Sequence, residues 1–160
     1  MKLQSSKLLV SKIILLIVFI LLNIQEIKAQ KSNTMKNHNS DTEAIKNTIE
    51  NNYFKGIYEG NELLLGSIFN PGTLVYGDVK GQPYFKTVDL YLDGVKNRQS
   101  PKDSGKPFKG EILTIKVVNS IAIAEIKVKM YDFNYVDFLS FHKINGQWLI
   151  VNKMLTDVSE

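Results

Sequence analysis

The stretch YVDFLSFHKINGQWLIVNKML, residues 135–155, decides the fold. It reads as two β-strands joined by a tight turn at Asn145-Gly146. Asn-Gly is the strongest short signal for a two-residue hairpin turn, because both central residues need positive φ. The turn fixes the pairing of the two strands, so that Phe141 faces Ile150. The chain therefore closes with a long antiparallel hairpin.

Side chains alternate along a strand, so this register divides the hairpin between two faces. One face carries Asp137, Leu139, Phe141, Trp148, Ile150 and Met154. The other carries Phe138, Ser140, His142, Leu149, Val151 and Lys153. The first face is bulkier and more apolar, and we expect it to pack against helices with Trp148 buried in it. Asp137 is then a lone carboxylate on an apolar wall. It is either a structural acceptor of hydrogen bonds or a polar anchor or general base in a pocket.

The segments before the hairpin indicate helices first and strands later. Residues 40–60 and 62–69 read as two helices, 73–85 as two short strands and 87–98 as a third helix. Residues 99–110 read as a loop, and 111–133 as a second long hairpin. Within the first helix Ile45, Ile49, Tyr53 and Ile57 recur every four residues, which places them on one face. Helices gathered before a run of strands indicate an α+β fold with a curved antiparallel sheet.

The N-terminal segment has the order of a secretory signal peptide. Residues 1–29 are basic, then apolar, and end in the small residue Ala29. We expect cleavage there, a flexible leader over 30–40 and one domain over 41–160. The alternative is an uncleaved membrane anchor. With cleavage, the protein is secreted or periplasmic and keeps no stable membrane span.

Composition excludes several classes of function. Removal of residues 1–29 takes away four Lys and one Glu, which lowers the net charge from +4 to +1. No basic patch then remains to suggest nucleic acid. The chain has no cysteine, so disulfides and thiol catalysis are excluded. It also lacks zinc-ligand spacing, a phosphate-binding glycine loop and a nucleophile elbow. We expect neither a metal nor a cofactor.

Two motifs resemble a known family. YFKGIYEGNELLLGSIFNPG resembles the Tyr-x-x-Gly-x-x-x-Gly-Asp/Asn segment leading into a Phe-x-Pro turn of the putative lumazine-binding family. VDFLSFHKINGQWLIVNK resembles that family's closing hairpin. The matching positions are Tyr53, Gly56, Gly60, Asn61, Phe69 and Pro71, then Asp137, Lys143, Asn145, Gly146, Trp148, Ile150, Val151 and Lys153. Both occur in order, and the resemblance spans roughly residues 42 to 156.

The resemblance implies a fold of the nuclear transport factor 2-like superfamily. That fold is a cone-shaped α+β barrel, in which a curved antiparallel sheet wraps around a long N-terminal helix. The open end of the cone commonly forms a pocket, and members often form homodimers through the outer face of the sheet. The superfamily contains isomerases, dehydratases, ligand binders and partner-binding modules, so function must be argued from the site.

On this fold the expected pocket is lined by aromatic residues around one acid. Its residues are Tyr53, Tyr76, Tyr84, Tyr91, Tyr131, Asp137, Phe141 and Trp148. Enzymes of the superfamily typically pair an Asp with a His or a Tyr, but His142 lies on the opposite hairpin face from Asp137.

Three functions stay open. The leading one is an exported, non-catalytic domain that binds a small apolar or aromatic ligand. The second is an isomerase- or dehydratase-type enzyme with Asp137 as base and a tyrosine as donor. The third is a dimeric interaction module with a filled cone.

Overall fold

The computed structural model describes residues 39–159. The expected signal peptide and almost all of the expected leader lie outside the described residues. Residues 40–159 belong to one compact unit. No helix within residues 39–159 is long and apolar enough to cross a membrane.

The first helix supplies one wall of the interior. Residues 39–48 are α-helical, and the helix continues through the π-helical segment η1 (Ile49–Phe54) and α2 (Lys55–Glu59). The predicted stripe is confirmed, because Ile45, Ile49, Tyr53 and Ile57 are all buried. A π-helical turn holds more residues than the 3.6 of an α-helical turn. Residues four apart therefore stay on the face that meets the sheet.

Three shorter helices follow, and local capping explains their bounds. They are α3 (Glu62–Gly66), α4 (Val88–Asn97) and α5 (Pro101–Ser104). The Asn61 side chain accepts from the backbone N–H of Leu64 at 2.9 Å, and Thr87 caps α4 in the same way. The expected loop over 99–110 differs, since it contains α5 and the start of the next strand. Ser100 caps α5.

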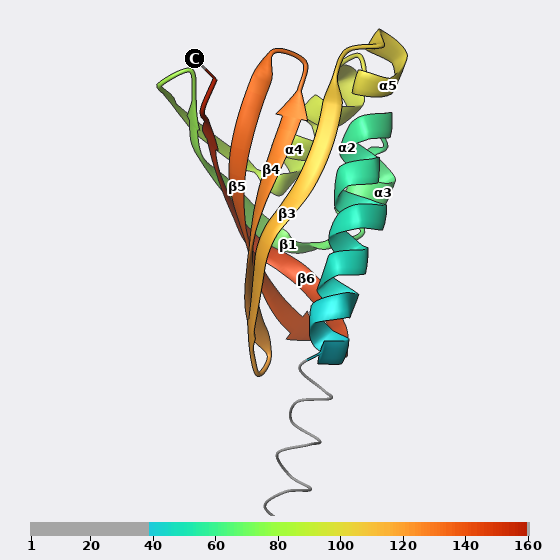
Figure 1. The fold of residues 1–160 in the computed structure, drawn as a ribbon, viewed down its shortest axis with the longest axis vertical. Coiled ribbons are helices and arrows are strands. Elements are labelled where there is room, and N and C mark those ends of the chain that lie inside the picture. Colours follow the sequence, from blue (N-terminus) through green and yellow to red (C-terminus); the bar gives the residue numbers. More distant parts are fainter. Residues whose placement is uncertain (1–38, 160) are drawn as a thin grey trace, which may run out of the picture. The chain divides into compact units, whose positions relative to one another are not determined.

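A curved, unclosed six-stranded sheet forms the other layer, and the first helix lies beside it (Figure 1). Its strands are β1 (Phe69–Val79), β2 (Gln82–Thr87), β3 (Phe108–Val118), β4 (Ile121–Met130), β5 (Phe133–Ile144) and β6 (Gln147–Asp157). Their order is β2-β1-β6-β5-β4-β3. The predicted α+β fold is confirmed. One pairing differs from an all-antiparallel sheet, because β1 and β6 run parallel. The long chain between them permits this.

The closing hairpin has the predicted turn. Asn145 and Gly146 have φ of 50° and 82°, and Phe141 pairs with Ile150 as expected. Trp148 is buried, as predicted, and its Nε1–H donates to Asp41 Oδ1 at 3.1 Å. The turn end of the hairpin is therefore closed by the start of the first helix.

Beyond Ile150 the predicted register is wrong. The pairing shifts by one residue at a β-bulge, which leaves Val151 as the extra residue, so Asp137 pairs with Leu155 rather than Met154. The bulge reverses the side-chain directions of the rest of β6. Lys153, expected on the outer face, is only 3% exposed, whereas Met154, expected inside, is 47% exposed. A lysine therefore enters the interior beside Asp137.

Candidate functional site

Three polar side chains meet inside the domain. Tyr53 comes from η1, Asp137 from β5 and Lys153 from β6, and none is more than 3% exposed. The Tyr53 hydroxyl donates to Asp137 Oδ2 at 2.8 Å. The Lys153 ammonium donates to the Tyr53 hydroxyl oxygen at 2.5 Å and forms an ion pair with Asp137 Oδ2. We call this set the Tyr53–Asp137–Lys153 cluster.

Burial changes the acid–base properties of the cluster. It lowers the pKa of Lys153 from its usual value, although the neighbouring Asp137 carboxylate opposes that change and the Arg98 charge adds to it. Burial also raises the pKa of Tyr53 far above 10, and the charge of Asp137 raises it further. Tyr53 is therefore a neutral hydroxyl at physiological pH, while Lys153 and Asp137 compensate each other in the interior.

A cavity opens on this cluster. The cavity has a volume of about 70 Å³ and is partly open to solvent. Its polar lining consists of Tyr53, Tyr84, Tyr91, Tyr135, Arg98, Asp137 and Lys153. Its apolar lining consists of Ile57, Val79, Val128, Met130 and Leu155. A mostly apolar and aromatic wall with a few converging polar groups is typical of a small-molecule site.

The tyrosines of the wall stay protonated. Burial raises the pKa of Tyr84 and Tyr91, and the Arg98 charge opposes both rises. Burial together with the charge of Asp157 raises the pKa of Tyr135 to about 12. Each ring therefore offers an apolar surface and a neutral hydroxyl to whatever occupies the cavity.

Two polar groups of the lining have unused hydrogen-bonding capacity. Among residues 39–159, the buried Nε and Nη2 atoms of Arg98 and the buried Oδ1 atom of Asp137 have no hydrogen-bond partner. Buried polar atoms are nearly always hydrogen-bonded, so each such exception needs an explanation. Because Arg98 and Asp137 both line the cavity, these atoms are candidates for contact with a bound molecule.

The structure brings together four of the expected pocket residues and separates four others. Tyr53, Tyr84, Tyr91 and Asp137 line the cavity, whereas Tyr76, Tyr131, Phe141 and Trp148 do not.

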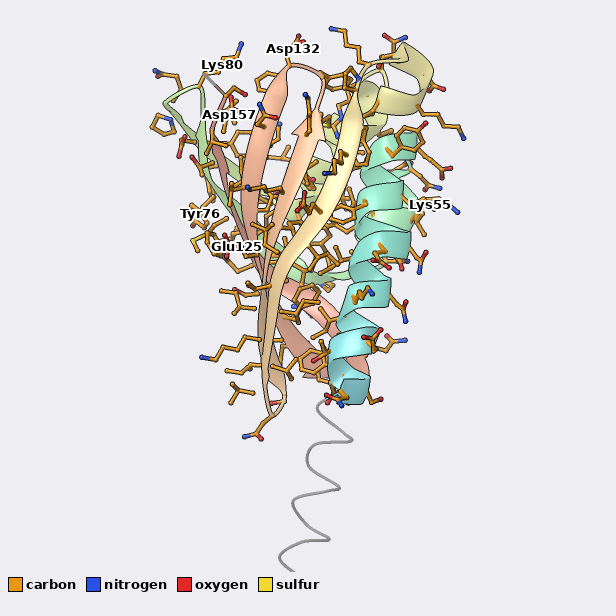
Figure 2. The ribbon with its side chains drawn as sticks, viewed as in Figure 1. Lys55, Tyr76, Lys80, Glu125, Asp132 and Asp157 are labelled. Carbon is orange, nitrogen blue, oxygen red and sulfur yellow. The ribbon has the colours of Figure 1, made fainter. Side chains whose placement is uncertain are left out.

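Tyr76 follows the inward-facing Val75 on β1 and therefore points to the opposite side of the sheet. There it is 44% exposed and contacts Phe85. Figure 2 shows it on the side away from the helix. Tyr131 lies in the turn after β4, and its hydroxyl donates to the carbonyl of Gln99.

Phe141 and Trp148 face inward, as expected, but at the other end of the hairpin. Phe141 lies four residues along β5 from Asp137, which corresponds to about 13 Å of strand. Both side chains are buried close to the Asn145-Gly146 turn. They belong to the core at the closed end of the domain and do not reach the cavity.

Sequence reasoning missed three polar residues of the lining. Lys153 was placed on the outer face, because the sequence has no signal for the bulge that turns it inward. Tyr135 could have been found, since it lies two residues before Asp137 on the same strand and so shares its face. Arg98 had a compositional signal, because it is the only arginine among the 20 Lys and Arg residues of the sequence.

No group of His, Cys, Asp and Glu side chains within the described part of the chain could hold a metal ion. The cavity offers only Asp137 and Lys153 together with neutral hydroxyls and one guanidinium. Its chemistry is therefore that of hydrogen bonding, charge compensation and proton transfer.

Comparisons with solved structures define the fold class. The chain is similar to an NTF2-like protein of unknown function from Shewanella baltica, with 22% identity and a TM-score of 0.66, covering 76% of this chain and 96% of that one. A second NTF2-like protein, from Silicibacter pomeroyi, has 19% identity and a TM-score of 0.67, covering 74% and 97%. These likenesses show that the fold is NTF2-like.

The family follows from the sequence match. Residues 40–156 match the family described as putative lumazine-binding, and the chain belongs to that family. Among curated proteins, it is 29% identical over 104 residues to the aldolase FrzH of Cladobotryum sp, a match that covers 64% of this chain and 80% of the relative.

Proposed function

We propose that this protein binds a small, largely aromatic or apolar organic molecule in the cavity above the Tyr53–Asp137–Lys153 cluster. The observation that carries the proposal is the combination of a tyrosine-rich, apolar wall with a buried charged cluster on one side. The family description names a small heterocyclic ligand class, which supports binding of a small molecule without identifying it. An open cavity also argues against a purely structural, filled cone.

The lining suggests how such a ligand is held. Rings and aliphatic chains remove its apolar surface from water, while the tyrosine hydroxyls and the cluster fix its orientation. A buried ion pair is weak evidence for stability, because removing two charges from water is costly. The presence of Lys153 and Asp137 in the interior is explained more simply if they contact a bound ligand.

Native mass spectrometry of the protein purified from its host tests this proposal. We expect a retained small molecule that Val79→Trp reduces, because Val79 lines the cavity and a larger ring there fills it. Leu63→Trp is the matched control, since Leu63 is 79% exposed on α3 and does not line the cavity. Equal retention by both variants would contradict binding in this cavity.

A second candidate function is proton-transfer catalysis with Asp137 as base. It is favoured by Asp137, which lines the cavity beside neutral tyrosine hydroxyls and whose buried Oδ1 atom has no hydrogen-bond partner among residues 39–159. Such hydroxyls stabilise an oxyanion that forms when a proton is removed next to a carbonyl group. The name aldolase of the relative from Cladobotryum supports a carbonyl substrate.

Exchange of deuterium into a probe ketone, 4-hydroxyphenylacetone in D₂O, tests the catalytic candidate. We expect wild-type protein to speed exchange at the carbon next to the carbonyl group and Asp137→Asn to lose that effect. Exchange at the buffer rate with wild-type protein would reject catalysis on this class of substrate and leave the binding proposal intact.

We further propose that two copies associate through the outer face of the sheet. Tyr76, Ile121, Ile123, Phe138 and Met154 are exposed there. A second copy would cover this apolar surface, which is unusual for an isolated chain. Light scattering after gel filtration should then give the mass of a dimer for wild-type protein and the mass of a monomer for Ile123→Lys. A monomeric mass for wild-type protein would reject the proposal.

Export remains a proposal based on the order of charge and hydropathy in residues 1–29. N-terminal sequencing of the protein from its host should give a chain that starts at or near Gln30. Recovery of intact Met1 in a membrane fraction would indicate an anchor instead.

A further inference from the structure

We propose that Arg98 forms an anion subsite in the cavity and that the ligand is a small aromatic carboxylic acid bound through its carboxylate. This inference rests on the proposed function and adds the chemical class of the ligand. It starts from the one guanidinium of the chain, which lies at the end of α4 and lines the cavity.

The unpaired atoms of Arg98 have the geometry of a carboxylate site. Nε–H and one of the two NH₂ groups lie on the same side of a guanidinium and point in parallel. Together they form a fork for two oxygen atoms. In Arg98, Nε and Nη2 are both buried and lack a hydrogen-bond partner within residues 39–159. None of the ion pairs among these residues involves Arg98. The fork therefore has no partner among the described residues, and a ligand carboxylate in the cavity that Arg98 lines would supply one.

The choice of residue type points the same way. Lysine and arginine are not interchangeable, because only arginine presents rigid, planar donors that match a carboxylate with two hydrogen bonds. This sequence has no second arginine, and its other permanently charged basic side chains are all lysines. The single arginine lines the cavity, where a planar oxyanion could be bound. A solvated surface charge would not require an arginine, because a lysine provides the same charge.

The charges of the lining favour a monoanion. The charged side chains that line the cavity are Arg98, Lys153 and Asp137. Lys153 and Asp137 form an ion pair, so one positive charge remains. A carboxylate carries one negative charge and balances it. A phosphate monoester carries about −1.5 to −2 at neutral pH and would leave uncompensated negative charge in a partly enclosed site.

The second unpaired group restricts the ligand further. The buried Oδ1 atom of Asp137 is an acceptor, so a hydroxyl or amino group on the ligand can donate to it. A molecule with a carboxylate, an aromatic body and a hydrogen-bond donor offers a partner to each of the two groups and rings for the tyrosine wall. 4-Hydroxyphenylacetate has these features and is the probe that we choose.

A single arginine makes the experiment specific. Protein labelled with ¹⁵N-arginine has one Nε–H resonance, which reports Arg98 without assignment. We expect 4-hydroxyphenylacetate to shift this resonance and to bind about tenfold more tightly, or better, than its neutral amide, because a charged hydrogen bond replaces a neutral one. Phenyl phosphate should bind more weakly than the carboxylate.

Two variants complete the test. Arg98→Gln should bind the carboxylate and the amide equally well. Lys55→Gln removes the same charge from a side chain that points away from the sheet (Figure 2) and should keep the wild-type preference. Circular dichroism checks that both variants are folded.

The possible failures are distinguishable. Equal binding of acid and amide to wild-type protein would overturn the anion subsite and leave the ligand cavity standing. Tightest binding of phenyl phosphate would overturn the carboxylate assignment. Failure of all three compounds to bind would count against both the subsite and the proposed function.

Discussion

Replacing Asp137 with Asn tests whether the buried cluster is held together by charge. Asn is nearly isosteric, but it removes the negative charge that compensates Lys153. The Lys153 ammonium then remains buried beside Tyr53 with no counter-ion. Removing one partner of a buried ion pair typically costs about 3–5 kcal/mol, because the other charge stays desolvated.

The magnitude can be read from urea unfolding. With a slope of about 2 kcal/mol per molar urea, a loss of about 4 kcal/mol moves the midpoint by about 2 M. The fluorescence of Trp148, the only tryptophan, reports the transition. Since domains of this size have about 5–15 kcal/mol of stability, we expect Asp137→Asn to remain folded in water.

The pH dependence gives the prediction a sign. Burial lowers the pKa of Lys153, whereas the charge of Asp137 raises it. Loss of that charge in Asp137→Asn therefore lowers the pKa of Lys153 further. Between that lowered pKa and about 10.5, the unfolded state binds more protons than the folded state, so stability rises with pH. The destabilisation of Asp137→Asn should therefore shrink as the pH rises from neutral towards about 10.5.

A pair of variants provides the control. Lys153→Met alone should cost a similar amount, because it leaves the Asp137 carboxylate buried with only the Tyr53 hydroxyl as donor. The double variant Asp137→Leu/Lys153→Met removes both charges and should be within about 1 kcal/mol of wild type or more stable. A midpoint for Asp137→Asn that hardly moves at neutral pH, or a double variant as unstable as the singles combined, would refute the reasoning.

Three further predictions follow from burial, backbone contacts and ionisation. Trp148→Ala should lower the free energy of unfolding, followed by circular dichroism, by about 3–5 kcal/mol. Trp148→Phe should lower it by about 1 kcal/mol, because the hydrogen bond to Asp41 is lost; unchanged unfolding midpoints would contradict this packing. A Cβ on Gly77 would lie 1.7 Å from the Leu155 carbonyl oxygen, so Gly77→Ala should lower the melting temperature sharply. The control Gly94→Ala on α4 should stabilise the protein by about 0.5–1 kcal/mol, and equal effects of the two variants would be inconsistent with the β1–β6 contact. Because burial raises the pKa of the cavity tyrosines, with that of Tyr135 at about 12, their contribution to stability is complete below about pH 10 and is lost as pH rises through the folded-state values. Absorbance at about 295 nm should show fewer than seven tyrosines ionising before the protein unfolds, and full ionisation of the folded protein near pH 10 would contradict their burial.

Local patterns predicted most of the fold. The Asn145-Gly146 turn and the every-fourth-residue stripe through Tyr53 are each decided by a few neighbouring residues, and the structure has both. The parallel pairing of β1 with β6 joins segments more than 70 residues apart, and no local signal specifies it.

The site was harder to predict, because it depends on one displaced residue. The bulge at Val151 reverses the direction of Lys153, so strict alternation from the turn placed the counter-ion of Asp137 on the wrong face. The expected place of Tyr76 in the pocket differs from the structure for another reason, since a tyrosine on an edge hairpin suits either face of a sheet. Neither outcome follows from residue type alone.

The most direct test of a ligand site in this cavity is to locate a bound molecule relative to the seven tyrosines. Protein protonated only in its tyrosine rings and otherwise deuterated would be mixed with 4-hydroxyphenylacetate, and nuclear Overhauser effects from the ligand measured. We predict effects to the cavity residues Tyr53, Tyr84, Tyr91 and Tyr135 and none to Tyr58, Tyr76 or Tyr131, which lie outside it. Effects confined to those last three rings would contradict the account.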